Sequence, residues 1–254
     1  GESIRIGAGS LITSSTSSGG DAGLIALTAT GAIALDDSAI NTDTADCLAV
    51  CDGSGAGGTI RFKADTLDLD FSEVSSRTAG VGNAGLVQID VEKGVQLSGA
   101  TISTNASGCD FACDAGDAGA IAIDAGSLSL SNGSAITSTT SATGHAGSVT
   151  LHTAGLLSLD GSQIGTTSLA CGEDCASGDA GTVSIGTGSL TMNSTSSVSS
   201  DTFGSGRAGT VNVTTGALAI SDQSNVSSST HGAGDAGERE RNILANLCRY
   251  HRKG

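Results

Sequence analysis

The chain of 254 residues has no proline and no tryptophan, and its aromatic residues are one tyrosine and four phenylalanines. A rounded core fills poorly without large side chains, because protein interiors are packed as densely as organic crystals. The scarcity argues against an ordinary globular enzyme. It favours a narrow interior that Val, Ile, Leu and Ala can fill without larger side chains.

Long apolar runs are missing too. No stretch approaches the ~20 apolar residues that a membrane-spanning helix needs, and helical periodicity is absent before the C-terminal tail. No secretory signal opens the chain. Because Gly1 falls inside a partial repeat, GESIRIGAGSL, we expect the chain to be part of a longer protein.

Positive charge is scarce, since 11 Lys and Arg residues face 26 Asp and Glu residues, for a net charge of −15. This net charge is the sum of −18 on residues 1–237 and +3 on residues 238–254. An acidic body repels phosphate backbones and anionic membranes, so we expect no nucleic-acid partner and no membrane insertion. The acidic residues are explained by the need to keep a long surface, otherwise apolar and hydroxyl-bearing, in solution. A salt-rich habitat and loose binding of divalent cations are the alternatives.

What the chain does contain is a repeat. The unit at residues 178–202, GDAGTVSIGTGSLTMNSTSSVSSDT, has three short segments in which apolar and polar residues alternate. The aliphatic residue of the third segment recurs at steps of alternately 28 and 34 residues, so the true period is 62 residues. It falls at Ile12, Ile40, Val74, Ile102, Ile136, Ile164, Val198 and Val226.

A spacing of two residues puts the apolar side chains of a segment on one face of a strand, while the polar residues between them face water. Helical repeats of similar length would need good helix formers and a 3.6-residue period, which these segments lack. We therefore predict an all-β parallel β-helix (single-stranded β-solenoid) with about eight coils of three short strands over residues 1–237. Coils spaced by ~4.8 Å would make a rod of roughly 40 Å.

A turn of the form Gly-x-Ala-Gly precedes each first strand, as at residues 116–119 and 178–181. Its glycines supply positive φ angles or allow stacked backbones to approach closely. A column of calcium ligands could not alternate aspartate with alanine and arginine, so this is turn chemistry, and we predict no metal or cofactor. The variable second residue is Asp21, Ala56, Asn83, Asp117, His145, Asp179, Arg207 and Asp235.

Each longer coil carries an insertion with a Cys-x-x-x-Cys motif, and the insertions recur every 62 residues. Successive pairs would lie ~10 Å apart, too far to share one tetrahedral zinc site. We predict a disulfide within each loop in a protein exported to an oxidising space, with a metal or redox array as the alternative. The pairs are Cys47 and Cys51, Cys109 and Cys113, and Cys171 and Cys175.

No pair of acids is convincingly catalytic. Arg61 and Lys63 lie near Asp65, Asp68 and Asp70 in the densest mixed cluster. A polysaccharide-cleaving solenoid would use clustered acids with a basic residue. A solvated strand face explains the cluster as well, and we predict no catalytic residue.

A hydroxyl column follows the third strand, four residues past its aliphatic position. We expect these residues to stack and hydrogen-bond from coil to coil. A threonine ladder on a flat face could instead match an ice lattice, so ice binding is an alternative function. The column contains Thr16, Thr44, Thr78, Thr140, Ser168, Thr202 and Thr230, with Ala106 as its exception.

The tail, residues 238–254, breaks the repeat with ERERNILANLCRYHRKG. One interpretation is a short amphipathic helix that caps the solenoid with Ile243, Leu244 and Leu247. The other is that the tail is disordered, or arises from a shifted reading frame or a truncated gene.

Residues 206–230, GRAGTVNVTTGALAISDQSNVSSST, and residues 144–168 follow the pattern GxAGxVxIxxGxLxLSxxSxISSST. This pattern resembles the repeats of filamentous-haemagglutinin-like exoproteins, the secreted partners of two-partner secretion systems in Gram-negative bacteria, cyanobacteria among them. The resemblance covers about residues 2–237. It implies a right-handed parallel β-helix in an extracellular or surface-attached adhesin, with no catalytic residues to transfer.

We therefore expect a non-catalytic structural or adhesive rod that displays its cysteine-bearing loops. Its partner would be the surface of a host or neighbouring cell, including its carbohydrate. An outer-membrane transporter would be engaged only through a family N-terminal domain that has no counterpart here. A carbohydrate-binding or polysaccharide-degrading β-helix is the first alternative, and an ice-binding solenoid the second.

Overall fold

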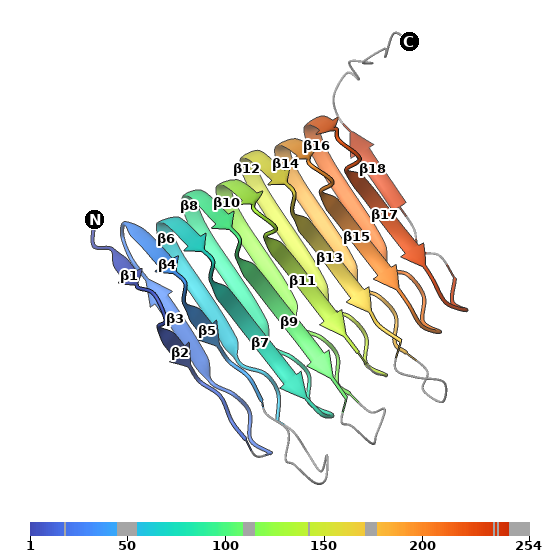
Figure 1. Ribbon diagram of the computed structural model, residues 1–254, viewed down its shortest axis with the longest axis horizontal. Coiled ribbons are helices and arrows are strands. Elements are labelled where there is room, and N and C mark those ends of the chain that lie inside the picture. Colours follow the sequence, from blue (N-terminus) through green and yellow to red (C-terminus); the bar gives the residue numbers. More distant parts are fainter. Residues whose placement is uncertain are drawn as a thin grey trace.

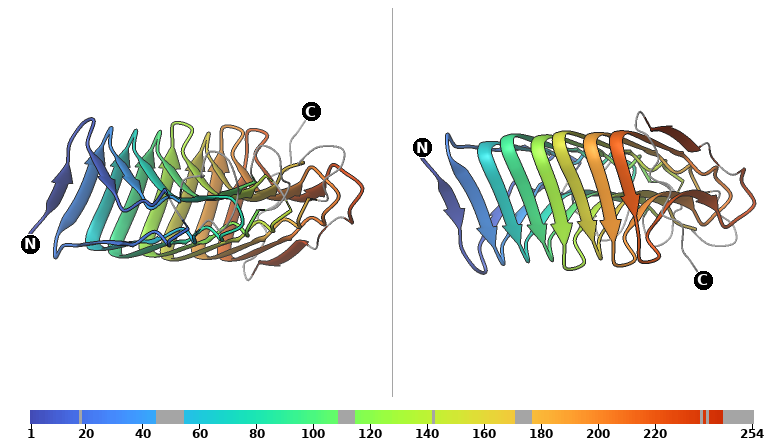
Figure 2. Two further views of the ribbon diagram at one scale, coloured as in Figure 1. Left: turned by 90° about the horizontal axis from the view of Figure 1, so that it is seen from below. Right: turned by 90° about the horizontal axis from the view of Figure 1, so that it is seen from above.

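The strands of the computed structural model lie in two parallel sheets, sheet A and sheet B, which form two layers along a rod (Figures 1 and 2). The structure describes residues 1–17, 19–44, 55–108, 115–141, 143–170, 177–235, 237 and 239–243. Sheet A contains β1 (Ile4–Ile6), β3 (Leu24–Thr28), β4 (Ala32–Asp36), β6 (Thr59–Asp70), β8 (Leu86–Ser98), β10 (Ala120–Ser131), β12 (Ser148–Asp160), β14 (Thr182–Asn193), β16 (Thr210–Ile220) and β18 (Arg239–Ile243). Sheet B contains β2 (Leu11–Thr13), β5 (Ala39–Asn41), β7 (Glu73–Ala79), β9 (Thr101–Ser107), β11 (Ala135–Thr140), β13 (Gln163–Ser168), β15 (Ser197–Thr202) and β17 (Asn225–Thr230).

Strands alternate between the two sheets along the chain, and each pairs in parallel with its counterpart in the next coil. The register follows the repeat. Ile102 of β9 pairs with Ile136 of β11, which pairs with Ile164 of β13. The prediction of an all-β parallel structure is confirmed, and the alternating two-sheet arrangement is consistent with a β-solenoid.

The strands of sheet A are longer than expected. The segments predicted as first and second strands are separate in β3 and β4, but from β6 to β16 they run together into one strand. The pairing of β10 with β8 shifts in register between Ala125 and Ser127, at the junction of the two segments. Gly126 lies at this junction, and glycine in the interior of a strand often marks such a bulge or bend. The hydrogen-bond pattern therefore gives two strands per coil where three were expected.

The core lies between the sheets and consists almost entirely of aliphatic side chains. The predicted third-strand residues from Ile40 to Val198 are each 0% exposed. Phe62, the one aromatic residue in this cluster, is 1% exposed. Burial of aliphatic area supplies the main driving force for such a fold.

A sharp turn leads from sheet A to sheet B, and its residues adopt positive φ angles. Asp37 (φ 45°) and Phe71 (φ 43°) each occupy this position in one coil. A serine follows in most coils; the Ser38 N–H donates to Ser72 Oγ at 3.1 Å, and the Ser162 N–H donates to Ser196 Oγ at 3.2 Å. These serines tie the turns of neighbouring coils together.

The tail begins with a strand. β18 pairs in parallel with β16 and adds one more strand to sheet A, so residues 239–243 are not the start of the short helix considered above. Leu244 and Leu247 lie outside the described residues. Within the described ranges, there is no helix of the length and apolarity needed to cross a membrane.

Candidate binding surface

From Thr44 to Thr202, the predicted hydroxyl column lies inside the rod, while Thr16 and Thr230 at its ends are partly exposed. Its residues are in register along sheet B, and Thr140, Ser168 and Thr202 are each 0% exposed. The Thr44 hydroxyl donates to Thr78 Oγ1 at 2.8 Å, which is the expected bond from coil to coil. Further along, the hydroxyls of Ser168, Thr202 and Thr230 donate to backbone carbonyls instead, as Thr202 Oγ1 does to the Arg207 carbonyl at 2.7 Å. The buried Thr140 hydroxyl has no hydrogen-bond partner in the described chain.

A second inward-facing hydroxyl column, two residues earlier in each coil, was missed in the sequence. Ser138 Oγ donates to the Gly119 carbonyl at 2.9 Å and accepts the Gly147 N–H at 3.0 Å. Ser200 Oγ likewise donates to the Gly181 carbonyl at 2.8 Å. The signal is that every coil has Ser or Thr at this position: Ser14, Thr42, Ser76, Thr104, Ser138, Thr166, Ser200 and Ser228.

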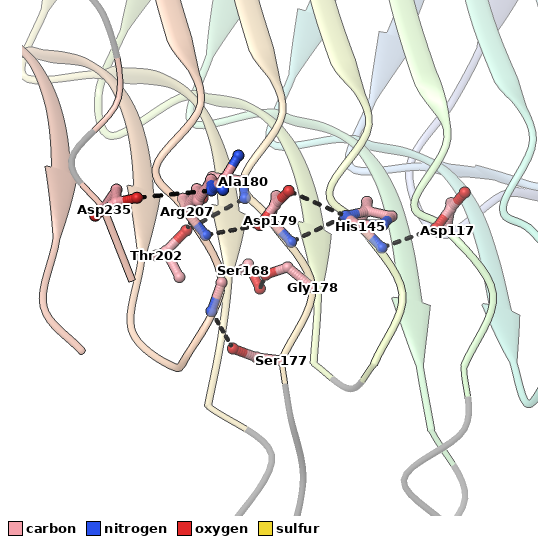
Figure 3. A network of polar contacts seen from close by, with 11 residues as sticks. Asp117, His145, Ser168, Ser177, Gly178, Asp179, Ala180, Thr202, Arg207 and Asp235 are labelled. Carbon is pink, nitrogen blue, oxygen red and sulfur yellow. Dashed lines mark hydrogen bonds and ion pairs between the residues drawn. The ribbon is translucent and has the colours of Figure 1, made fainter. Parts of the chain in front are cut away.

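The Gly-x-Ala-Gly turns form a polar ladder on the edge of the rod (Figure 3). The backbone N–H of His145 donates to Asp117 Oδ1 at 2.8 Å, and that of Arg207 donates to Asp179 Oδ1 at 2.7 Å. His145 Nδ1 accepts the Asp179 N–H at 3.0 Å, which requires that nitrogen to be unprotonated. Aspartate, asparagine and histidine can all occupy this position because each offers one acceptor atom to the next turn. Arg207 offers none, and its Nε instead lies 3.8 Å from Asp235 Oδ2.

The mixed cluster on β6 is divided among neighbouring coils. Lys93 Nζ lies 2.6 Å from Asp65 Oδ2, and this hydrogen bond and charge raise the pKa of Lys93. Lys63 Nζ lies 3.8 Å from Asp90 Oδ2. Partial burial raises the pKa of Asp68, which is in register with uncharged neighbours, Ala34 and Gln96. The predicted residues therefore do not converge on one reacting centre.

A row of charged side chains crosses the outer face of sheet A. Lys63, Asp90, Asp124 and His152 are in register on β6, β8, β10 and β12. His152 Nδ1 lies 3.4 Å from Asp124 Oδ1, and all four side chains are more than half exposed. Among the described residues, no group of three or more His, Cys, Asp or Glu side chains could hold a metal ion.

The six paired cysteines, Cys47, Cys51, Cys109, Cys113, Cys171 and Cys175, lie outside the described residues, so the disulfides stay a prediction.

A shallow, open groove of about 690 Å³ lies on sheet B. It crosses five successive coils, from the turn at Gly9 to Thr137 of β11. Its rim is the sharp turn between the sheets, where Phe71 lies, and its floor carries outward-facing residues such as Thr101, Ser103 and Asn105. We name this feature the sheet B groove.

Comparison with protein-family models, with curated proteins and with solved structures found no match to this chain. The resemblance to filamentous-haemagglutinin-like repeats therefore stays a prediction from the repeat pattern.

Proposed function

We propose that the chain is a rigid, non-catalytic structural or adhesive segment of a secreted or surface-attached bacterial exoprotein. The observation that carries this proposal is the continuity of the coil-to-coil interactions. Parallel pairing, the aliphatic core and the turn ladder each connect one coil to the next over nearly the whole described chain. Such a molecule is quasi-one-dimensional and suits a spacer.

The proposal includes finer structural features. The coils form a right-handed parallel β-helix of the filamentous-haemagglutinin-like kind, in which the bend within each long strand separates a first from a second segment and sheet B supplies the third. The disulfide-linked loops project from one side of the rod. We place the protein outside the cell or on the surface of a Gram-negative bacterium, where the partner is another cell.

Two alternatives have less support. The threonine column proposed as an ice-binding ladder is buried from Thr44 to Thr202, so it offers no flat outer face to ice. Polysaccharide cleavage would need Arg61 and Asp68 to act together, yet Arg61 lies on the segment of β6 before the bend and Asp68 on the segment beyond it.

Beads coated with the protein test the proposal. We expect them to attach to bacterial or host cells more than albumin-coated beads do, while incubation with neutral and acidic polysaccharides releases no reducing ends. Release of reducing ends that is lost in Arg61→Ala or Asp68→Ala would overturn the non-catalytic function. Attachment no better than that of albumin would remove adhesion and leave the spacer.

A further inference from the structure

Phe71 is an aromatic residue in an unfavourable position. It has a φ angle of 43°, a region that bulky residues rarely adopt, and its side chain is 64% exposed. Aspartate and glycine take the equivalent turn position in other coils, as Asp37 and Gly99 do. Backbone strain combined with exposure of an aromatic ring does not stabilise the fold, so another role explains the residue better.

The ring of Phe71 lies over a space that Gly99 leaves free. A Cβ atom at Gly99 would lie 2.7 Å from Cδ1 and Cε1 of Phe71, closer than carbon atoms approach. Gly99 in the next coil therefore lets the ring lie across the turn at the rim of the sheet B groove. The ring lies against Gly99 on one side, while 64% of the side chain stays exposed.

The floor of the groove offers hydrogen-bonding groups. Thr101, Ser103 and Asn105 line it from β9, and Thr137 lines it from β11. Asn105 Oδ1 is buried and has no hydrogen-bond partner in the described chain. An unpaired buried acceptor costs free energy, so no hydrogen bond at Oδ1 holds the partly exposed Asn105 amide in this orientation. Hydroxyl and amide groups beside an aromatic ring can orient a small polar ligand.

The charges of the groove select among such ligands. Its charged side chains are Asp37 and Glu73, and no Lys or Arg is among the described residues that line it. Arg77, the nearest basic residue on β7, is engaged with Asp43, whose Oδ2 lies 3.5 Å from its Nη2. With a net charge of −15 on the chain, a polyanion would be repelled.

The dimensions favour a chain over a single sugar. Five coils span about 19 Å along the rod at the usual strand spacing. The volume of about 690 Å³ falls within the roughly 300–1,000 Å³ of small-ligand sites.

We propose that the sheet B groove binds an uncharged oligosaccharide, with the Phe71 ring against the C–H face of one sugar and Thr101, Ser103 and Asn105 on its hydroxyls. This inference rests on the proposed adhesive function and names the chemistry of its partner. It assigns the contact to the strand surface near the N-terminal end rather than to the cysteine-bearing loops.

Binding of immobilised hexasaccharides tests the proposal. The panel contains uncharged β-1,4-glucan, α-1,4-glucan, β-1,3-glucan and β-1,4-mannan, with α-1,4-galacturonan as the charged comparison. We expect at least one uncharged oligomer to bind, with a Kd that rises about ten-fold or more in Phe71→Ala and Phe71→Gly. Phe71→Tyr should retain binding. Phe203→Ala is the matched control, since Phe203 is 46% exposed on another edge.

Phe71→Gly separates recognition from stability, because glycine relieves the positive φ angle. Its melting temperature should equal or exceed that of the wild type while binding is lost. The inference would be overturned if no uncharged oligomer bound, or if both Phe71 variants bound as well as the wild type. Stronger binding of galacturonan than of the uncharged oligomers would also overturn it. If coated beads still attach to cells in those cases, the adhesive function stands with a different ligand; if they do not, both fail.

Discussion

At the scale of single residues, a tight constraint lies at the last glycine of the Gly-x-Ala-Gly turns from Gly85 onward. A Cβ atom at Gly147 would overlap the carbonyl oxygen of Gly119 in the preceding coil. Both atoms belong to stacked backbones, so neither can move without disturbing the coil spacing. We expect Gly147→Ala to lower the free energy of unfolding by about 2–3 kcal/mol.

Gly186 provides the matched control for that substitution. It lies in β14, where the atom nearest to an added Cβ is Cδ2 of His152 at 3.5 Å, an ordinary contact. Alanine there should be neutral or stabilise the strand by about 0.5–1 kcal/mol. Urea denaturation of the two variants measures both effects. Equal stabilities would contradict the close backbone approach.

Asp68 is the residue with a predictable pH dependence. Its pKa is raised by burial, so the ionised form is disfavoured in the folded state. A carboxyl group whose pKa is higher in the folded state than in the unfolded state stabilises the fold at pH values below its unfolded-state pKa. This stabilisation is lost as the pH rises through the folded-state pKa. Asp68→Asn should therefore raise the melting temperature at pH ~7 and change it little at pH ~3. A uniform effect at both pH values, or a lower melting temperature at neutral pH, would contradict this assignment.

The sequence predicts which way an aliphatic side chain faces much better than it predicts the orientation of a polar one. Residues such as Ile102 and Ile136 reveal their inward orientation by hydrophobicity alone. Ser and Thr occur on both faces of sheet B, so composition cannot distinguish the buried Ser138 from the outward Thr137. Phe71 was missed because its φ angle and its place over Gly99 depend on the turn geometry, which the residue type does not indicate.

At the scale of elements, the long strands of sheet A differ most from expectation. Gly126 and Gly155 suggest breaks between two strands when read in sequence. In the structure, the pairing only shifts register near these residues, and the strand continues. Glycine in a strand interior marks a bulge or bend as readily as an end, so sequence alone could not decide between two strands and one.

The cysteine-bearing insertions carry the prediction that belongs to this scale. Each Cys-x-x-x-Cys pair should form a link within its own loop. Mass spectrometry of peptides from the non-reduced protein should show Cys47 with Cys51, Cys109 with Cys113 and Cys171 with Cys175. Such small closed loops contribute about 2 kcal/mol each at most through chain entropy, so reduction should leave the β-sheet circular dichroism signal in place. Free thiols at all six positions would refute the assignment.

At the scale of the whole molecule, stability is expected to be a sum of similar coil-to-coil terms. Every strand between β6 and β14 pairs with neighbours on both sides, and the core is continuous along the rod. The 62-residue period should therefore be a unit that can be removed without harm. A globular domain with one closed core has no such unit.

Deletion of residues 116–177 tests this modularity. It joins Ala115 to Gly178, so the turn at residues 178–181 takes the place of the turn at residues 116–119. The next sheet B strand is then β15 in place of β11. We expect a folded protein with the same β-sheet circular dichroism per residue and a rod about 10 Å shorter in small-angle scattering.

Deletion of residues 120–150 is the control, because it removes half a period. That deletion moves His152 to the inward position of Ile121 and reverses the faces of the following strand. It should aggregate or lose its cooperative melting transition. If both deletions fold equally well, the buried faces do not specify the register; if neither folds, the coils are not independent units, and the rod must be stabilised by contacts that span more than adjacent coils.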